Sequence, residues 1–196
     1  MKEDYPLKKF ASARGFEQWL SRNHAKADGV RIQMARKSSG IRSVHYAEAL
    51  EVALCYGWID GQSKSMDKQW FWQRFTPRRA RSLWSKRNRD IVARLIAEGR
   101  MQTAGQAEID RARADGRWDA AYDSPASATV PDDLEAALRK APEARKFFAS
   151  LDSRNRYAIL HRLMIAKKPE TRAKRLAAFV AMLRERRTLY PIPAGR

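Results

Sequence analysis

The densest group of residues that could do chemistry lies in the stretch RFTPRRARSLWSKRN, residues 74–88. Arginine side chains form paired hydrogen bonds to phosphate or carboxylate oxygens, and neighbouring hydroxyl and amide groups can add further bonds. Between residues 68 and 100, ten lysines and arginines stand against only two carboxylates. The pattern predicts a binding site for an anion. The candidate ligand-binding residues are Trp58, Asp60, Arg74, Thr76, Arg78, Arg79, Ser82, Trp84, Ser85 and Asn88.

These candidates have different expected roles. Arg74, Arg78 and Arg79 would bind the oxygens of the anion. The side chains of Thr76, Ser82, Ser85 and Asn88 would add hydrogen bonds, and Trp58 or Trp84 would form one wall of the pocket. A helix that begins after Ser85 or Asn88 would contribute unpaired N–H groups and the positive end of its dipole. The alternative is that Ser85 and Asn88 are ordinary helix caps and the arginines a solvated rim.

Patterns typical of catalysis or metal binding are absent from the sequence. The three histidines, His24, His45 and His161, lack zinc-binding spacing, and the common glycine-rich and serine-nucleophile motifs do not occur. The single cysteine, Cys55, lies in the apolar run EALEVALCYGW and is expected to be a buried, unreactive thiol. We therefore expect a non-catalytic protein with no cofactor and no metal. An enzyme acting on a phosphorylated small molecule remains an alternative, with Asp60 as the base beside the arginines.

The whole chain is strongly basic. Its 196 residues include 40 lysines and arginines and 22 carboxylates, a formal charge of +18, and the hydrophobic fraction of 44% is enough for a packed core. This surplus favours anionic partners, either a phosphate-bearing small molecule or a nucleic acid, and a protein partner is also possible. The N-terminal residues lack the apolar run of a signal peptide, and no segment has the ~20 apolar residues that span a bilayer. These features predict a cytoplasmic protein.

Local periodicity predicts the elements that position the site. Helical spacing begins after Ser12 and again after Ser43, and period-two alternation predicts strands at VRIQMARK, WIDGQS and KQWFWQRF. We expect an α+β fold in which about three antiparallel strands pack with helices, followed by a helical C-terminal region. The expected boundaries are an α+β domain at 1–121, a linker at 122–131 and the helical region at 132–196.

The last predicted strand carries two tryptophans on one face. Trp70 and Trp72 are two residues apart, whereas Gln73 and Phe75 belong to the opposite face. We expect the tryptophans to be buried beneath the first two helices, because a small domain needs their large apolar area. The alternative is an exposed pair that stacks on a base or a sugar ring.

A second basic region occupies residues 154–187, where eleven lysines and arginines stand against Glu170 and Glu185. Its helices combine an apolar stripe with a basic face. That face could contact a nucleic-acid backbone without sequence preference, or an anionic lipid surface. A nonspecific nucleic-acid-associated protein is therefore a third possible function.

Several long blocks resemble the YdeI/OmpD-associated family, whose members are also called bacteriocin-protection proteins. The blocks are ALCYGWIDGQ, QRFTPRRARSLWSKRN, LIAEGRMQTAGQAEIDRARADGRWDAAY and SLDSRNRYAILHRLMIAKKPETRAKRLAAFV, and the resemblance covers about residues 14–187. It implies a link to envelope stress, through protection against bacteriocins or cationic peptides and association with an outer-membrane porin. All ten candidate site residues match positions of the family's shared blocks, together with Gly61, Phe75 and Pro77.

Overall fold

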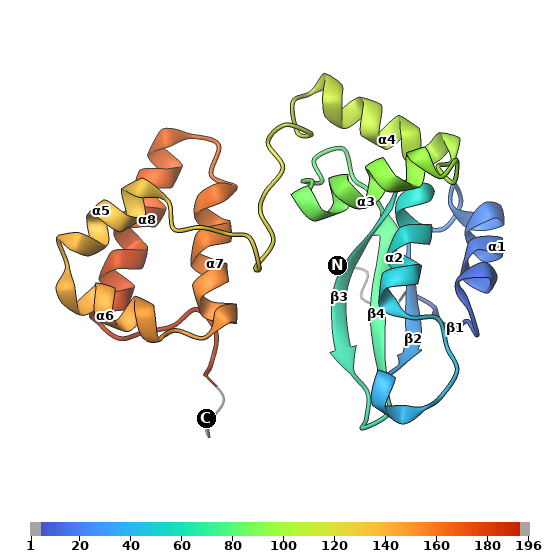
Figure 1. Ribbon diagram of the computed structural model, residues 1–196, viewed down its shortest axis with the longest axis horizontal. Helices are drawn as coiled ribbons and strands as arrows, with labels where there is room; N and C mark the ends of the chain where they lie inside the picture. Colours follow the sequence, from blue (N-terminus) through green and yellow to red (C-terminus); the bar gives the residue numbers. More distant parts are fainter. Residues whose placement is uncertain (1–4, 193–196) are drawn as a thin grey trace. The chain divides into compact units, whose positions relative to one another are not determined.

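The computed structural model describes residues 5–192, and the chain divides into two compact units, Met1–Ala121 and Tyr122–Arg196. The first unit contains β1 (Leu7–Lys9), α1 (Ala13–Asn23), β2 (Val30–Ala35), the 3₁₀ turn η1 (Lys37–Ser39), α2 (Tyr46–Cys55), β3 (Trp58–Ser65), β4 (Trp70–Pro77), α3 (Lys86–Ala97) and α4 (Thr103–Ala114) (Figure 1). The second contains α5 (Asp132–Arg139), α6 (Pro142–Ser150), α7 (Ser153–Met164) and α8 (Pro169–Arg184). The predicted α+β class is confirmed, with helices following the sheet toward the C-terminus.

The sheet of the first unit has four strands in the order β1-β2-β4-β3, not about three. The β2–β4 and β3–β4 pairs are antiparallel as expected, whereas β1 pairs with β2 in parallel. Strand β1 is three residues long, so its sequence LKK is too short to show an alternating pattern. It becomes a strand through its pairing with the edge of β2, with Leu7 opposite Arg31 and Lys9 opposite Gln33.

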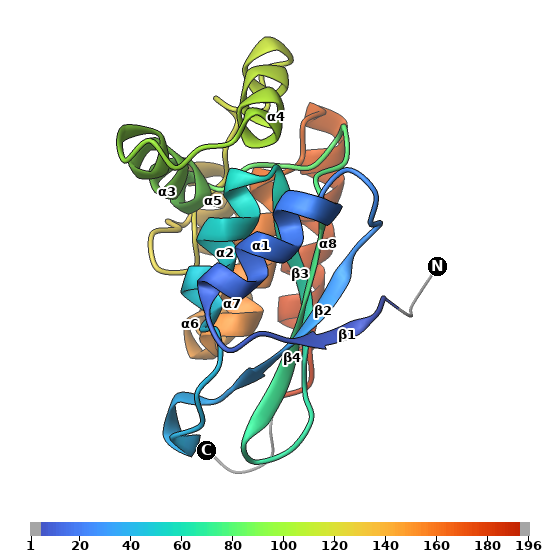
Figure 2. The same ribbon diagram turned by 90° about the vertical axis from the view of Figure 1, so that its right-hand side faces the viewer.

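Helices α1 and α2 cover one face of this sheet (Figures 1 and 2). The alternating apolar residues of β2, Val30, Ile32 and Met34, are fully buried and pack with Phe16 of α1 and Leu50 of α2. The period-two pattern of β2 predicts this core face, although Gln33 and Ala35 of the opposite face are also buried.

The expectation that Trp70 and Trp72 lie beneath the helices is wrong. The antiparallel register places Phe75 opposite the buried Val30, so Phe75 and Gln73 belong to the helix-covered face and the tryptophans to the other. Trp70 and Trp72 are half-buried there. The polar Gln73 is accommodated in the core because its Nε2 donates a 2.8 Å hydrogen bond to a backbone oxygen at the irregularity of β3.

Helix starts follow side-chain capping. Ser12 caps α1, as the sequence predicts, and of the two expected caps of α3, Ser85 and Asn88, the cap is Ser85. The cap of α2 is His45, however, and not Ser43. The hydroxyl of Ser43 instead accepts a 2.9 Å hydrogen bond from the backbone N–H of Ala35, at the end of β2. Ser43 therefore ties the loop before α2 to the sheet.

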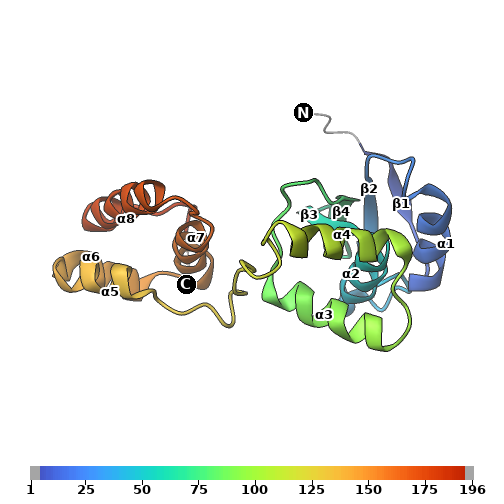
Figure 3. The ribbon, with the colours of Figure 1, turned by 90° about the horizontal axis from the view of Figure 1, so that it is seen from above.

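The second unit is a small helical body with its own apolar core, which includes Leu134, Phe148, Leu160 and Leu183 (Figure 3). A paired contact joins its first and last helices, because the Arg172 side chain donates hydrogen bonds of 2.7 and 2.8 Å to both carboxylate oxygens of Asp133. Across residues 5–192, none of the helices combines the length and the apolar character needed to cross a membrane.

Candidate functional site

A cavity of about 350 Å³ lies where β3, β4 and the turn after β4 meet the residue that precedes β1. It brings together five of the ten predicted ligand-binding residues. The lining residues are Tyr5, Asp60, Gly61, Arg74, Thr76, Pro77, Arg79 and Ser82.

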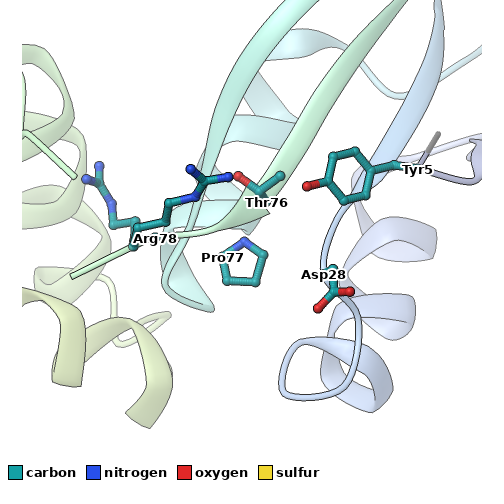
Figure 4. Close-up of a pocket in the computed structure, with 6 residues that line it drawn as sticks. Tyr5, Asp28, Thr76, Pro77 and Arg78 are labelled. Atoms are coloured by element: carbon teal, nitrogen blue, oxygen red, sulfur yellow. The ribbon is translucent and has the colours of Figure 1, made fainter. Parts of the chain in front are cut away.

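A second hollow of about 440 Å³ shares four lining residues with this cavity. Asp28 and Arg78 line only this second hollow. Figure 4 shows Tyr5 and Thr76 pointing toward one another across it, from segments that are far apart in the sequence. The two hollows therefore form one recessed region, which we call the arginine cavity after Arg74 and Arg79.

Arg74 is held close against strand β3. Gly61 follows Asp60, at the point where the register of β3 shifts, and a Cβ atom built on Gly61 would come within 2.9 Å of the Arg74 Nε. The missing side chain is what lets the guanidinium lie across the neighbouring strand. Its Nε atom is buried and has no hydrogen-bond acceptor among the described residues. A buried donor without a partner is costly, so the Arg74 side chain is held at this position by its packing on β3.

Arg79 is presented by a tight turn. Its backbone N–H donates a 2.9 Å hydrogen bond to the Ser82 hydroxyl, and the Ser82 N–H donates a 2.8 Å bond to the Arg79 carbonyl. The turn leaves the Arg79 side chain exposed at the cavity. Arg74 and Arg79 thus bring two positive charges to one cavity, from the strand and from the turn.

Asp60 brings a negative charge to the same cavity. Its Oδ2 accepts a 2.8 Å hydrogen bond from the Tyr46 hydroxyl of α2. Burial, reinforced by the neighbouring Asp60 carboxylate, raises the pKa of Tyr46 well above its ordinary value. Tyr46 therefore stays protonated at neutral pH and holds Asp60 in place as a hydrogen-bond donor.

The structure changes the expected role of Arg78. Its guanidinium carbon lies 3.6 Å from the centroid of the Trp84 ring, and its Nη1 donates a 3.1 Å hydrogen bond to the Leu83 carbonyl. Only 5% of the residue is exposed. Arg78 lines the second hollow, but its guanidinium stacks on a buried aromatic ring and bonds within the turn that follows β4.

Four other predicted site residues do not line the arginine cavity. Trp58 and Trp84 are each 1% exposed and belong to the core of the first unit, because their rings carry the apolar area that this core needs. The hydroxyl of Ser85 accepts a 3.1 Å hydrogen bond from the N–H of Asn88, and both residues are buried. Ser85 therefore serves as the cap of α3 and pairs the N–H of Asn88.

Tyr5 and Asp28 are the lining residues that sequence reasoning missed. Tyr5 precedes β1, and its ring packs so closely on Gly29 that a Cβ atom there would come within 2.7 Å of it. Neither residue belongs to the basic stretch, and their approach depends on the parallel pairing of β1 with β2. No local pattern signals such a contact.

Other reactive groups of the described chain lie outside the cavity. Burial raises the pKa of the Cys55 thiol to about 11, which agrees with the expected buried and unreactive cysteine. Within residues 5–192, no three or more His, Cys, Asp or Glu side chains gather in a way that could hold a metal ion.

Several arginines of the second basic region are engaged within the helical unit. Arg172 pairs with Asp133, Arg175 donates to the backbone of Arg162, and Arg154 stacks on Tyr190. A hollow of about 400 Å³ lies beside Arg154 and includes His161. Burial, with a smaller contribution from Arg162, lowers the pKa of His161, which favours the neutral imidazole in this hollow.

Comparison with known proteins gives two family matches. Residues 8–108 match the family described as "Domain of unknown function (DUF8412)", and residues 127–186 match the family described as "Bacteriocin-protection, YdeI or OmpD-Associated". The YdeI/OmpD-associated resemblance is thus shown for the C-terminal helices, whereas most of the blocks quoted from the first unit fall within the other match. Neither curated proteins nor solved structures give a match.

Proposed function

The chain belongs to the family described as Domain of unknown function (DUF8412), and we propose that its first unit binds a phosphate-bearing ligand in the arginine cavity. The observation that carries the proposal is that Arg74, from strand β4, and Arg79, from the turn after it, line one cavity. Arg79, Thr76 and Ser82 line the same cavity and supply a second charge and two hydroxyl groups.

The chemistry of the lining favours phosphate over a single carboxylate. Guanidinium groups from two separate segments suit an anion whose oxygens point in several directions. Asp60 also lines the cavity, and one of its carboxylate oxygens accepts the hydrogen bond from Tyr46 of α2. A phosphate group with one esterified and three free oxygens fits this combination of donors.

The YdeI/OmpD-associated match suggests where such binding would be used. The matched family is described by bacteriocin protection, and the match lies in the second unit. We extend the proposal to a role in protection against bacteriocins or envelope stress, in which the first unit binds the phosphate-bearing ligand. The cytoplasm remains the proposed location.

The variant Arg74→Ala/Arg79→Ala tests the proposal. Inorganic pyrophosphate at about one hundred times its Kd should stabilise the unaltered protein by about 2.7 kcal/mol, which raises Tm by several degrees. The double variant should lose most of this rise, because both guanidinium groups of the cavity are gone. Differential scanning fluorimetry with a pyrophosphate titration measures the shift.

A matched control separates a site from general charge. Arg14→Ala/Arg22→Ala removes two exposed arginines of α1, so the net charge changes equally. This control should keep the full pyrophosphate shift. An equal loss in both double variants would mean that the ligand responds to net charge and would remove the proposed site.

An enzyme acting on a phosphorylated small molecule is the second candidate, because Asp60 lines the same cavity as Arg74. It requires turnover as well as binding. Release of inorganic phosphate from sugar phosphates or nucleotides, abolished by Asp60→Asn, would favour the enzyme; binding without release favours the first proposal.

A further inference from the structure

The face of the sheet that α1 and α2 leave open carries aromatic and basic side chains together. The register of the strands places six of them on this face: Lys9, Arg31, Lys64, Trp70, Trp72 and Arg74. None of the described strand residues that the register places on this face is an aspartate or a glutamate. The open face is therefore positive along its length.

The two tryptophans are the centre of this open face. They are half-buried, although a Trp that served only as core would be expected beneath the helices. The Lys9 Nζ lies 5.0 Å from the Trp70 ring centroid, and the Arg31 guanidinium carbon lies 5.7 Å from that of Trp72. Each ring is thus paired with a cation of the same face.

The spacing suits a series of flat ligands. Trp70 and Trp72 are two residues apart on one strand, which sets their Cα atoms about 6.7 Å apart along it. Bases of a single strand stack on aromatic side chains with little sequence preference, because every base has a flat face, while nearby cations follow the phosphates. A duplex hides its base faces, so it cannot use such a platform.

Arg74 links this platform to the arginine cavity. It belongs to the same face as Trp72, and it also lines the cavity with Arg79. A strand whose bases rest on the tryptophans would therefore have a phosphate within reach of the cavity.

We propose that the open face of the sheet binds single-stranded nucleic acid, with bases stacked on Trp70 and Trp72 and a backbone phosphate held by Arg74 and Arg79. This inference rests on the phosphate site proposed above and identifies the class of its ligand. Lys9, Arg31 and Lys64, on the strands beside the tryptophans, contact the phosphates of the nucleic-acid backbone.

The test compares three fluorescently labelled probes by anisotropy on the full chain: a deoxythymidine dodecamer, an abasic dodecamer with the same phosphates, and a duplex of equal length. The dodecamer with bases should bind at least about tenfold more tightly than the abasic one, the loss expected when stacking on aromatic side chains is removed. The duplex should also bind more weakly than the single strand.

Two variants assign the difference to the tryptophans. Trp70→Ala/Trp72→Ala should reduce binding of the dodecamer with bases to the level of the abasic probe, while Trp70→Phe/Trp72→Phe should retain most of it because phenylalanine still stacks. Binding of pyrophosphate should be unchanged in both, which also shows that the variants are folded.

Each negative result would overturn a different part of the proposal. Equal binding of the abasic and base-bearing probes, or unchanged binding after Trp70→Ala/Trp72→Ala, would overturn the stacking platform while the phosphate site stands. Loss of the pyrophosphate response only in Arg74→Ala/Arg79→Ala would support that site. An unaffected pyrophosphate response in the same variant would overturn the phosphate site, and the tryptophan variants would still decide the platform.

Discussion

Arg78 and Arg79 are adjacent, yet their surroundings give them opposite tasks. The backbone N–H of Arg78 donates a 2.9 Å hydrogen bond to the Gly57 carbonyl, and its side chain turns inward onto Trp84. Arg79 falls on the turn closed by Ser82 and faces the arginine cavity. We therefore expect an alanine scan of this stretch to combine two effects, loss of packing on Trp84 at Arg78 and loss of the proposed ligand contact at Arg79.

Gly61 provides a more selective probe of the cavity. The variant Gly61→Ala would place a Cβ atom 2.9 Å from the Arg74 Nε, so the guanidinium must move away from its position over β3. We expect pyrophosphate affinity to fall roughly tenfold, equivalent to about 1.4 kcal/mol, with little change in Tm because the flexible arginine absorbs the contact. Isothermal titration calorimetry and thermal unfolding measure the two quantities.

The neighbouring change Ser63→Ala serves as the control, since Ser63 is an exposed residue of the same strand. It should leave affinity and Tm unchanged. A Gly61→Ala protein that binds pyrophosphate as tightly as the unaltered one would show that the position of Arg74 does not matter for binding.

At the scale of elements, the sequence predicts what local periodicity encodes. The alternation of β2, the hairpin of β3 and β4 and the Ser85 cap of α3 all follow from short-range patterns. Period two also separates the faces of β4, but it does not say which face meets the helices. That choice depends on the register with β2, which is a long-range property, and apolar area alone favoured the wrong face for Trp70 and Trp72.

The candidate site also divides into residues that short-range patterns predict and residues that only long-range contacts reveal. Arg74, Arg79 and Ser82 were found because charge and hydroxyl groups gather in one stretch, and the structure brings them to one cavity. Tyr5 was missed because it reaches the cavity from a distant segment. Trp84 and Ser85 were included because composition cannot distinguish a buried side chain from a lining one.

The contact between α5 and α8 gives a pH-dependent prediction. The Arg172 guanidinium, through its hydrogen bonds, lowers the pKa of Asp133 below its ordinary value. A carboxyl group with a lowered folded-state pKa stabilises the fold above its unfolded pKa of about 3.9, and this stabilisation disappears as the pH falls through the folded value. Asp133→Asn should therefore lower the free energy of unfolding by up to about 1 kcal/mol at pH 6, a modest effect because both side chains are partly exposed.

Urea unfolding followed by far-UV circular dichroism at pH 6 and pH 2.5 checks this prediction. The difference between Asp133→Asn and the unaltered protein should shrink at the lower pH. The change Glu170→Gln, at a carboxylate in the first turn of α8, provides a comparison outside the α5–α8 pair. A difference for Asp133→Asn that stays constant with pH would contradict a stabilising charge at Asp133.

At the scale of the whole molecule, the surplus charge of +18 is the main rival to a localised site. A chain with 40 lysines and arginines attracts anions over much of its surface, and salt weakens that attraction. Arg14, Arg22 and many other cations are exposed, so binding of an anion does not by itself identify the arginine cavity. A localised site requires that a few arginines respond to the ligand while the remainder do not.

A nuclear magnetic resonance titration that resolves the Nε–Hε groups of individual arginines tests this requirement most directly. Pyrophosphate is added to the full chain at about 0.15 M salt, where exposed charges are screened beyond roughly 8 Å, and single arginine-to-lysine changes assign the signals. The signals of Arg74 and Arg79 should move together and saturate, while those of Arg14 and Arg22 stay in place. Equal movement of all four, or an unmoved Arg74 signal, would contradict the proposed cavity site.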